Sequence, residues 1–195
     1  MKIETIEIFG FVSAIKALRL PYKSTNKSDS AAYGNFKQCT YNNIELKNSF
    51  AGDWYIKIGD NDLSILQRLI KNGDEHAKVV RGINVSCSII APRYWWQEMD
   101  TYRFGTDRLS SESTMHCEDI WLSGVELQKV KAELKEGFEQ ERIQMFSYQT
   151  LRRIYFQRKS HRLPEWTIFC NWIKSLPLSK ELILIDGGNK YDSEI

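Results

Sequence analysis

Hydrophobic and polar residues alternate strictly between residues 83 and 89, and this pattern constrains the fold more than any other. The apolar positions are Ile83, Val85, Cys87 and Ile89, and the polar positions between them are Asn84, Ser86 and Ser88. Successive side chains of a β-strand point to opposite faces of a sheet, so the pattern predicts a strand with one buried and one polar face. Such a strand needs neighbouring strands and a hydrophobic layer that covers one side of the sheet.

Other segments predict further strands and several helices. Residues 2–8 and 53–58 are typical of short strands, and residues 22–35 of a loop. Helices are predicted at residues 11–18 after Gly10, at 60–73 with Asp60 or Asn61 as the cap, and at 93–103 after Pro92. Three more are predicted at residues 125–146, at 151–160, and from Pro164 to the residue before Pro177. Strands and helices therefore mix in one α+β chain.

Composition indicates a single folded domain over residues 1–195, with a mobile tail at about 187–195. The chain is 42% hydrophobic and 12% aromatic, and its 27 basic and 25 acidic residues leave a net charge of only +2. This balance argues against general DNA or RNA binding. The absence of a long apolar run argues against a membrane span. The four cysteines, which are Cys39, Cys87, Cys117 and Cys170, form no CxxC pair, so we expect reduced thiols in a cytoplasm.

The predicted helix at residues 93–103 carries a polar face. Arg93, Gln97, Asp100 and Arg103 follow one another at spacings of four, three and three residues. Two guanidinium groups, an amide and a carboxylate suit the binding of phosphate or of a flat hydrogen-bonding ring. A solvated face with an intrahelical Arg–Asp pair is the alternative.

A loop rich in hydroxyl groups is expected after this helix. Gly105 permits a sharp turn, and five hydroxyl residues then surround Glu112: Thr106, Ser110, Ser111, Ser113 and Thr114. Such clusters also occur in ordinary turns, so the loop supports a binding site only through its position after an arginine-bearing helix.

Several common classes of enzyme are excluded by their missing motifs. The sequence contains no GxGxxG, Walker A, HExxH or GxSxG pattern. Its three histidines are His76, His116 and His161, and the run His116-Cys117-Glu118 is too compressed for a usual zinc site. We therefore expect no bound metal.

The order of these features resembles the flavin-dependent thymidylate synthases, from about Gly10 to Trp172. The shared order is a turn with Glu75-His76, a strand, Arg93 after Pro92, a helix ending in Arg103, and a Ser/Thr-rich segment. The family's R-H-R triplet reads Thr101-Tyr102-Arg103 here, its following serine reads Thr106, and its N-E-x-S-x-R-Y segment corresponds to residues 110–116. Leu151-Arg152 and the basic stretch before Trp166 match the family's L-R…R…Q-W segment. Tyr102 and Met115 replace a flavin-binding histidine and a phosphate-binding arginine.

The resemblance implies a central, mostly antiparallel sheet packed by long helices, and a specific chemistry. FAD would supply hydride, and a methylene group from methylenetetrahydrofolate would reach C5 of dUMP, with NADPH as a further co-substrate. It implies catalytic roles for Arg103 and Ser113, with Ser113 near the ring but not as a nucleophile. The implied substrate-binding residues are Arg93, Ser111, Glu112, Arg158 and Arg162, and the implied FAD-binding residues are His76, Tyr102, Arg103 and Thr106. Either Arg103 or Arg158 would stabilise negative charge on the pyrimidine.

The resemblance also implies a homotetramer, for which the Trp95-Trp96 pair would be an interface anchor. Two alternatives stay open. The protein could be a related enzyme that adds a hydroxymethyl group to a pyrimidine nucleotide, as would suit a phage with altered DNA, or a non-catalytic protein that binds a nucleotide or only assembles. For single residues, Arg158 and Arg162 could merely flank a helix end, His76 and His161 could lie on the surface, and the tryptophans could be core residues.

Overall fold

The computed structural model describes residues 1–33, 39–41, 44–46, 55–114 and 123–186. The chain divides into two compact units, one formed by Met1–Phe9 with Ile83–Ile185 and the other by Gly10–Gly82 with the segment from Asp186 onward. Each unit is described by itself below. The expectation of a single domain stays a prediction, and the tail at 187–195 lies outside the described residues.

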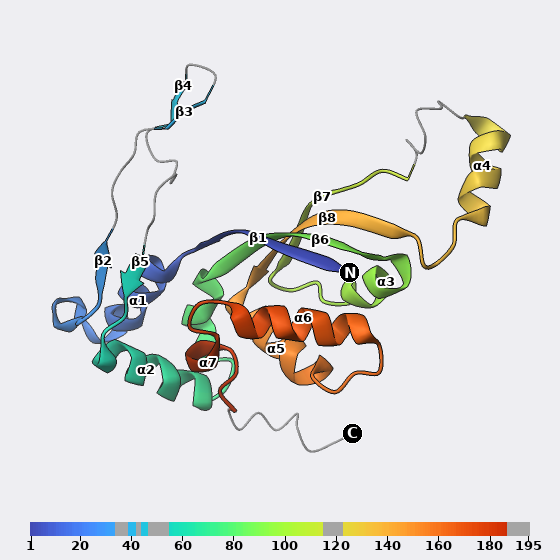
Figure 1. Ribbon diagram of the computed structural model, residues 1–195. Helices are drawn as coiled ribbons and strands as arrows, with labels where there is room; N and C mark the ends of the chain where they lie inside the picture. The colour runs from blue at the N-terminus through green and yellow to red at the C-terminus, as the bar shows by residue number, and fades with distance from the viewer. Residues whose placement is uncertain (34–38, 42–43, 47–54, 115–122, 187–195) are drawn as a thin grey trace. The chain divides into compact units, whose positions relative to one another are not determined.

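The first unit is built on a four-stranded sheet in which every neighbouring pair is antiparallel (Figure 1). Its strands lie in the order β1 (Lys2–Phe9), β6 (Asn84–Pro92), β8 (Glu139–Ser147) and β7 (Thr106–Ser111). The predicted α+β class with an antiparallel sheet is confirmed. A register shift between Thr5 and Glu7 interrupts the alternation in β1, and Ile6 at this irregularity is 55% exposed.

The predicted strand at residues 83–89 corresponds to β6 at the centre of the sheet. Val85, Cys87 and Ile89 are completely buried, as their alternation requires. Cys87 pairs with Gln144 of β8. Because directly paired residues point to the same face, Gln144 lies on the buried face of the sheet.

Helices cover this buried face. Figure 1 shows α5 (Tyr148–Arg158), α6 (Pro164–Ser175) and α7 (Ser179–Leu182) on the same side of the sheet, and α3 (Arg93–Met99) follows β6 directly. The helix predicted after Pro164 is confirmed. The helix predicted from residue 151 begins three residues earlier, because the Ser147 side chain accepts a hydrogen bond from Thr150 N and caps it.

An aromatic cluster fills the space between these helices and the sheet. Trp95 lies 4.9 Å from Trp96, 5.0 Å from Trp166 and 5.5 Å from Phe169, measured between ring centroids. All four residues have no exposed surface. The expectation that Trp95-Trp96 anchors a subunit interface is therefore wrong, because both rings are buried in the core of the unit.

The single helix predicted at residues 125–146 is wrong. The segment forms α4 (Gly124–Glu133) and then β8, with Gly137 between them. Arg142, Gln144 and Phe146 are buried and alternate with half-buried Ile143 and Met145. Both helical and strand spacing fit these apolar positions, and strand pairing on both sides decides between them.

Two further predictions near the arginine-bearing helix need correction. The helix ends at Met99 rather than at residue 103, so Arg93, Gln97, Asp100 and Arg103 do not share one helical face. The expected hydroxyl-rich loop is the edge strand β7 over residues 106–111, because its backbone pairs with β8. Gly105, with φ +71°, makes the turn between them.

The second unit contains short strands and helices. Their order is α1 (Phe11–Arg19), η1 (Leu20–Tyr22), η2 (Thr25–Lys27), β2 (Ala31–Tyr33), β3 (Cys39–Tyr41), β4 (Ile44–Leu46), β5 (Tyr55–Lys57), α2 (Asp60–Lys71) and η3 (Ala77–Gly82). Strand β2 pairs with β5, and β3 with β4, both antiparallel. The predicted strand at 53–58 and the helices after Gly10 and Gly59 are confirmed, whereas the loop predicted at 22–35 contains η2 and β2.

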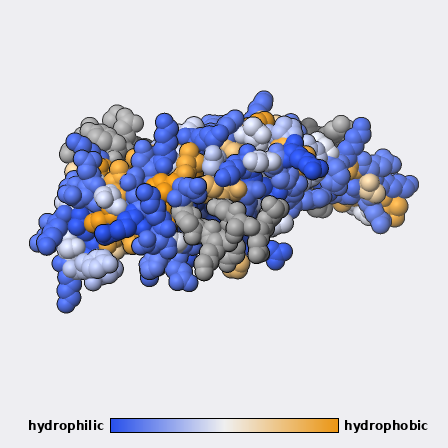
Figure 2. Space-filling view, turned by 90° about the horizontal axis from the view of Figure 1, so that it is seen from below, coloured by the Kyte–Doolittle hydropathy of each residue, from blue (hydrophilic) through white to orange (hydrophobic). Residues whose placement is uncertain are grey.

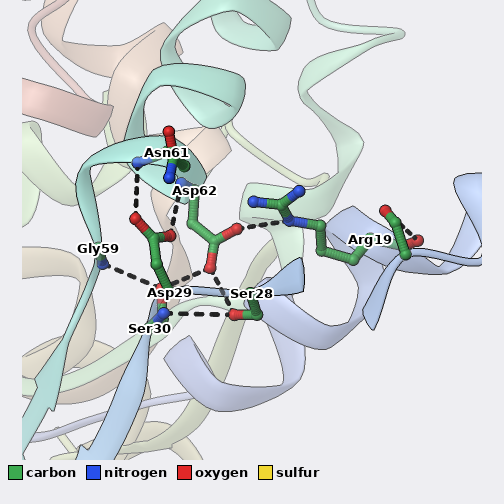
Figure 3. A network of polar contacts seen from close by, with 8 residues as sticks. Arg19, Ser28, Asp29, Ser30, Gly59, Asn61 and Asp62 are labelled. Atoms are coloured by element: carbon green, nitrogen blue, oxygen red, sulfur yellow. Dashed lines mark hydrogen bonds and ion pairs between the residues drawn. The ribbon is translucent and has the colours of Figure 1, made fainter. Parts of the chain in front are cut away.

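A polar network around Asp62 joins α1, α2 and the segment before β2 (Figure 3). The Asp62 carboxylate accepts hydrogen bonds from Arg19 Nε at 2.6 Å, Ser28 Oγ at 2.5 Å and Ser30 Oγ at 2.7 Å. The predicted cap of α2 was wrong: Gly59 is the N-cap residue, and the side chain of Asp29 accepts from Asn61 N at 2.9 Å and Asp62 N at 3.1 Å. A side chain 32 and 33 residues away in sequence from these two amide groups thus caps this helix, which local pattern alone does not predict.

The surface drawn in Figure 2 is mostly hydrophilic, with hydrophobic residues in separate groups. No helix among the described residues is long and apolar enough to span a membrane. The described residues also contain no cluster of three or more histidine, cysteine, aspartate or glutamate side chains that could hold a metal ion. Cys87 and Cys170 are free thiols, and burial raises their pKa to about 12 and about 11.

Candidate functional site

An open pocket of about 200 Å³ lies where the end of α3 meets strands β7 and β8. The chain from the end of α3 contributes Met99, Asp100, Tyr102 and Arg103, whereas Thr106 and Arg108 come from β7 and Gln144 from β8. Arg103 and Arg108 are exposed. All of these residues belong to the first unit.

The turn at Gly105 fixes the wall of this pocket. Ser147 N donates to the Gly105 carbonyl at 3.0 Å, and Thr150 Oγ1 donates to the Phe104 carbonyl at 2.8 Å. A Cβ atom at residue 105 would lie only 2.3 Å from Thr150 Oγ1, so the close approach requires glycine. The start of α5 thereby holds Arg103 and Thr106 in place.

The charge of Asp100 is balanced by Arg142, which does not line the pocket. Arg142 Nη1 donates to its two carboxylate oxygens at 2.9 and 3.1 Å, while Arg108 Nη1 lies 4.0 Å from Asp100 Oδ1. The Arg142 guanidinium lies 4.3 Å from the Trp96 ring centroid, and its burial lowers its pKa although the Asp100 pair opposes this. Arg103 makes no ion pair or hydrogen bond with the described part of the chain, so its charge is free to meet an anion.

Two buried oxygen atoms of this pocket have no hydrogen-bond partner among the described residues. They are Gln144 Oε1 and Thr106 Oγ1. Gln144 is only 2% exposed. A buried polar atom without a partner costs about 1–3 kcal/mol, and most such atoms in native proteins are satisfied. Two of them in one pocket therefore point to a ligand that donates hydrogen bonds.

A second polar cluster lies beside the pocket and shares Tyr102 with it. Arg158 Nε donates to Tyr102 Oη at 2.7 Å, and Arg158 Nη1 donates to Glu98 Oε2 at 2.9 Å. The same Glu98 oxygen accepts from Trp166 Nε1 at 2.8 Å and lies 3.5 Å from His161 Nε2. Burial raises the pKa of Tyr102, and the Arg158 hydrogen bond opposes this rise.

The structure brings three of the predicted site residues together. Tyr102, Arg103 and Thr106 line the pocket, and Arg158 reaches it through the Tyr102 hydroxyl. The Arg158 guanidinium is also stacked 4.6 Å from the Trp166 ring centroid. Arg158 is thus held in place on several sides by its own chain.

The other predicted residues lie apart from the pocket. Ser111 is the last residue of β7, and Glu112 and Ser113 follow it. Ser113 is five residues beyond Arg108, or about 17 Å along an extended chain. Glu112 Oε2 accepts from Glu141 N at 3.2 Å, which ties it to β8.

Arg93 lies at the opposite end of α3, where Nη1 donates to the Leu134 carbonyl at 3.4 Å. Arg162 is exposed between α5 and α6. His76 belongs to the second unit, so it is not placed relative to the pocket. Met115 and His116 lie outside the described residues. The roles assigned to these positions by resemblance stay predictions.

Two polar residues that line the pocket, Arg108 and Gln144, were missed by the sequence analysis, and so was Arg142, the partner of Asp100. Arg142 and Gln144 were hidden in the helix predicted at 125–146. Their spacing suits a helix or a strand, so only the pairing of β8 with its two neighbouring strands locates them.

Comparison with known proteins gives a match at the level of structure. No protein-family model matches the chain, and no curated protein matches its sequence. A crystal structure of thymidylate synthase X from Helicobacter pylori with FAD and dUMP matches with a TM-score of 0.65 at 13% identity, over 94% of this chain and 97% of that chain. A second structure, the flavin-dependent thymidylate synthase of Helicobacter pylori complexed with FAD and dUMP, matches with a TM-score of 0.66 at 13% identity, over 94% and 98%. The protein described here therefore has the fold of the flavin-dependent thymidylate synthases.

Proposed function

We propose that this protein is a flavin-dependent thymidylate synthase-like enzyme that acts on C5 of a pyrimidine nucleotide, dUMP, with FAD as cofactor. Methylenetetrahydrofolate would be the one-carbon donor and NADPH the reductant. The observation that carries the proposal is a pocket with exposed arginines and with two oxygen atoms that have no partner in the described part of the chain. The pocket lies on a fold that matches two structures of the Helicobacter pylori enzyme with FAD and dUMP.

The residues present fit a flat, charged heterocyclic ligand. Gln144 Oε1 and Thr106 Oγ1 would accept ring N–H groups, and Tyr102 offers an aromatic wall. Arg103 would bind phosphate or stabilise negative charge on the pyrimidine, because its guanidinium has no partner in the described chain. When bound, FAD would supply hydride, while the protein orients the rings and excludes water.

Assembly into a homotetramer is part of the proposal. Ligand pockets usually hold about 300–1,000 Å³, whereas this pocket holds about 200 Å³, enough for a ring but not for a whole dinucleotide. The sheet face opposite the helices carries the half-buried residues Ile90, Ile143 and Met145, and Phe104 beside Arg103 is 82% exposed. A second copy that covers such surface would enlarge the site. A cytoplasmic location and a phage origin stay predictions.

The test is an absorbance titration between about 300 and 550 nm, because bound isoalloxazine has characteristic bands there. We expect flavin uptake by the purified protein and a shift of the bands when dUMP is added. Arg103→Ala should abolish the shift, whereas Arg153→Ala, which changes an exposed arginine of α5 outside the pocket, should leave it intact. Absence of flavin uptake under all conditions would contradict the proposal.

One observation favours a second candidate. The resemblance assigns Arg158 to the substrate, but this guanidinium is bound to Glu98 and Tyr102. Changed chemistry, such as hydroxymethyl transfer, or nucleotide binding without catalysis would be compatible with this arrangement. Product analysis by mass spectrometry after incubation with dUMP, methylenetetrahydrofolate and NADPH separates methyl transfer, hydroxymethyl transfer and no reaction.

A further inference from the structure

Gln144 is the most deeply buried polar side chain of the pocket. Its strand β8 lies between β6 and β7, and its cross-strand partners are Cys87 and Arg108. The residue is 2% exposed, and its Oε1 atom has no partner among the described residues. A side chain in this central position cannot turn outward to water without leaving the sheet face.

No donor of the described residues forms a hydrogen bond with Gln144 Oε1. Arg142 directs Nη1 to Asp100 and Nε to Gln140 Oε1 at 3.1 Å. Thr106, which lines the pocket with Gln144, has its own unpartnered oxygen. The pocket is open, so a bound molecule can supply the missing donor.

The carboxamide restricts the chemistry of that molecule. A glutamine side chain offers an acceptor and a donor in one plane, so it pairs in two-point fashion with a ring edge that carries an N–H beside a carbonyl group. The N3 edge of a pyrimidine-dione has this pattern. Uracil and isoalloxazine rings both contain it.

We propose that Gln144 recognises the N3 imide edge of a pyrimidine-dione ring bound in this pocket, with Oε1 accepting the ring N–H. This inference rests on the proposed function and adds to it a specificity-determining residue. Methylation of the ring nitrogen would leave Gln144 Oε1 without its donor. The pocket should therefore discriminate against an N3-methyl ring.

The test combines a protein change with a ligand change. Dissociation constants are measured by calorimetry for wild type and for Gln144→Met. One pair of ligands is dUMP and N3-methyl-dUMP, measured without flavin. The other pair is lumiflavin and 3-methyl-lumiflavin, measured without nucleotide. Wild type should bind at least one parent ring about tenfold or more tightly than its N3-methyl form, because methylation removes the donor. Gln144→Met should bind that parent ring about tenfold more weakly than wild type does. Its affinities for the parent ring and for the N3-methyl form should differ by less than about twofold.

Because discrimination is a ratio measured on one protein, it is independent of the fraction of each variant that folds. An effect confined to dUMP identifies uracil as the ring at Gln144, and an effect confined to lumiflavin identifies the flavin. Gln157→Met is the matched control, since Gln157 is an exposed residue of α5 outside the pocket and should keep wild-type discrimination.

Equal discrimination in wild type and Gln144→Met would overturn the inference and leave the proposed function standing. Wild-type binding of neither dUMP nor lumiflavin would contradict both. A gain in stability of Gln144→Met with unchanged ligand binding would show that the unpartnered oxygen is only a structural cost, and would also overturn the inference.

Discussion

The two units of this protein differ in whether the chain itself supplies hydrogen-bond partners to particular buried polar groups. In the second unit, the fully buried carboxylate of Asp62 receives hydrogen bonds from Arg19, Ser28 and Ser30. In the first unit, Gln144 Oε1 and Thr106 Oγ1 are also buried but receive none from the described chain. A polar group whose partners all belong to the protein serves the fold, whereas a group left without a partner beside a pocket is suited to a ligand.

Removal of Arg19 should produce the largest effect on stability. Arg19→Met leaves the Asp62 carboxylate buried without its charged partner, and loss of one member of a buried pair costs about 3–5 kcal/mol. Arg68→Met, an exposed change on α2, is the control and should alter stability by less than about 0.5 kcal/mol. Urea unfolding followed by circular dichroism measures both, and equal midpoints would contradict the structural role of the network.

The Gly105 turn links the pocket to the start of α5, so its substitution should affect stability and site together. Gly105→Ala places a Cβ at 2.3 Å from Thr150 Oγ1 and 2.8 Å from Ser147 Oγ, in a backbone with φ +71°. We expect a loss of about 1–3 kcal/mol and weakened dUMP binding. Gly137→Ala, where nothing lies within 4 Å, should be neutral or slightly stabilising. Thermal unfolding of both variants is the measurement, and equal changes in their melting temperatures would contradict this description of the Gly105 turn.

Gln144→Met should change the free energy of unfolding in the opposite direction to Arg19→Met. Without ligand, the change removes an oxygen that has no partner, so the free energy of unfolding should rise by about 1 kcal/mol. The same variant should lose affinity for its ring ligand. Chemical unfolding with and without dUMP and FAD measures the difference, and a strong destabilisation in the absence of ligand would mean that Gln144 belongs to a structural network.

Acid should weaken the Asp62 network by a smaller amount. Desolvation by burial raises the pKa of Asp62, but hydrogen bonds from Ser28, Ser30 and Arg19 together hold it below 3.8. A lowered folded-state pKa gives stability that is present above the unfolded value and is lost as pH falls through the folded value. In Asp62→Asn, unfolding stability measured from pH 6 down to pH 3 should therefore fall less steeply below about pH 4 than in wild type. Parallel curves would contradict this assignment.

Much of the first unit is predictable because its patterns are local. The alternation around Val85 gave the central strand, and Pro164 with Trp166 and Phe169 gave α6. Strand β8 was not predictable from its own residues, because Ile143 and Met145 suit either a helix or a strand and the partner strands decide.

The candidate site was only partly predictable. Tyr102, Arg103 and Thr106 lie close together in sequence and meet in the pocket, as the order of residues suggested. Gln144 comes from a distant strand and reaches the pocket through strand pairing with β7. Likewise, Asp29 caps α2 only after the chain folds back. Contacts of this kind depend on tertiary structure, which neither residue spacing nor propensity contains.

A crystal structure of the protein grown with FAD and dUMP tests the central claim most directly. The account predicts electron density for a planar ring in the pocket between Tyr102, Thr106 and Gln144, with a ring nitrogen about 2.7–3.2 Å from Gln144 Oε1. Density for both ligands elsewhere on the fold, for example only beside Ser113, or an empty pocket at saturating ligand, would contradict it.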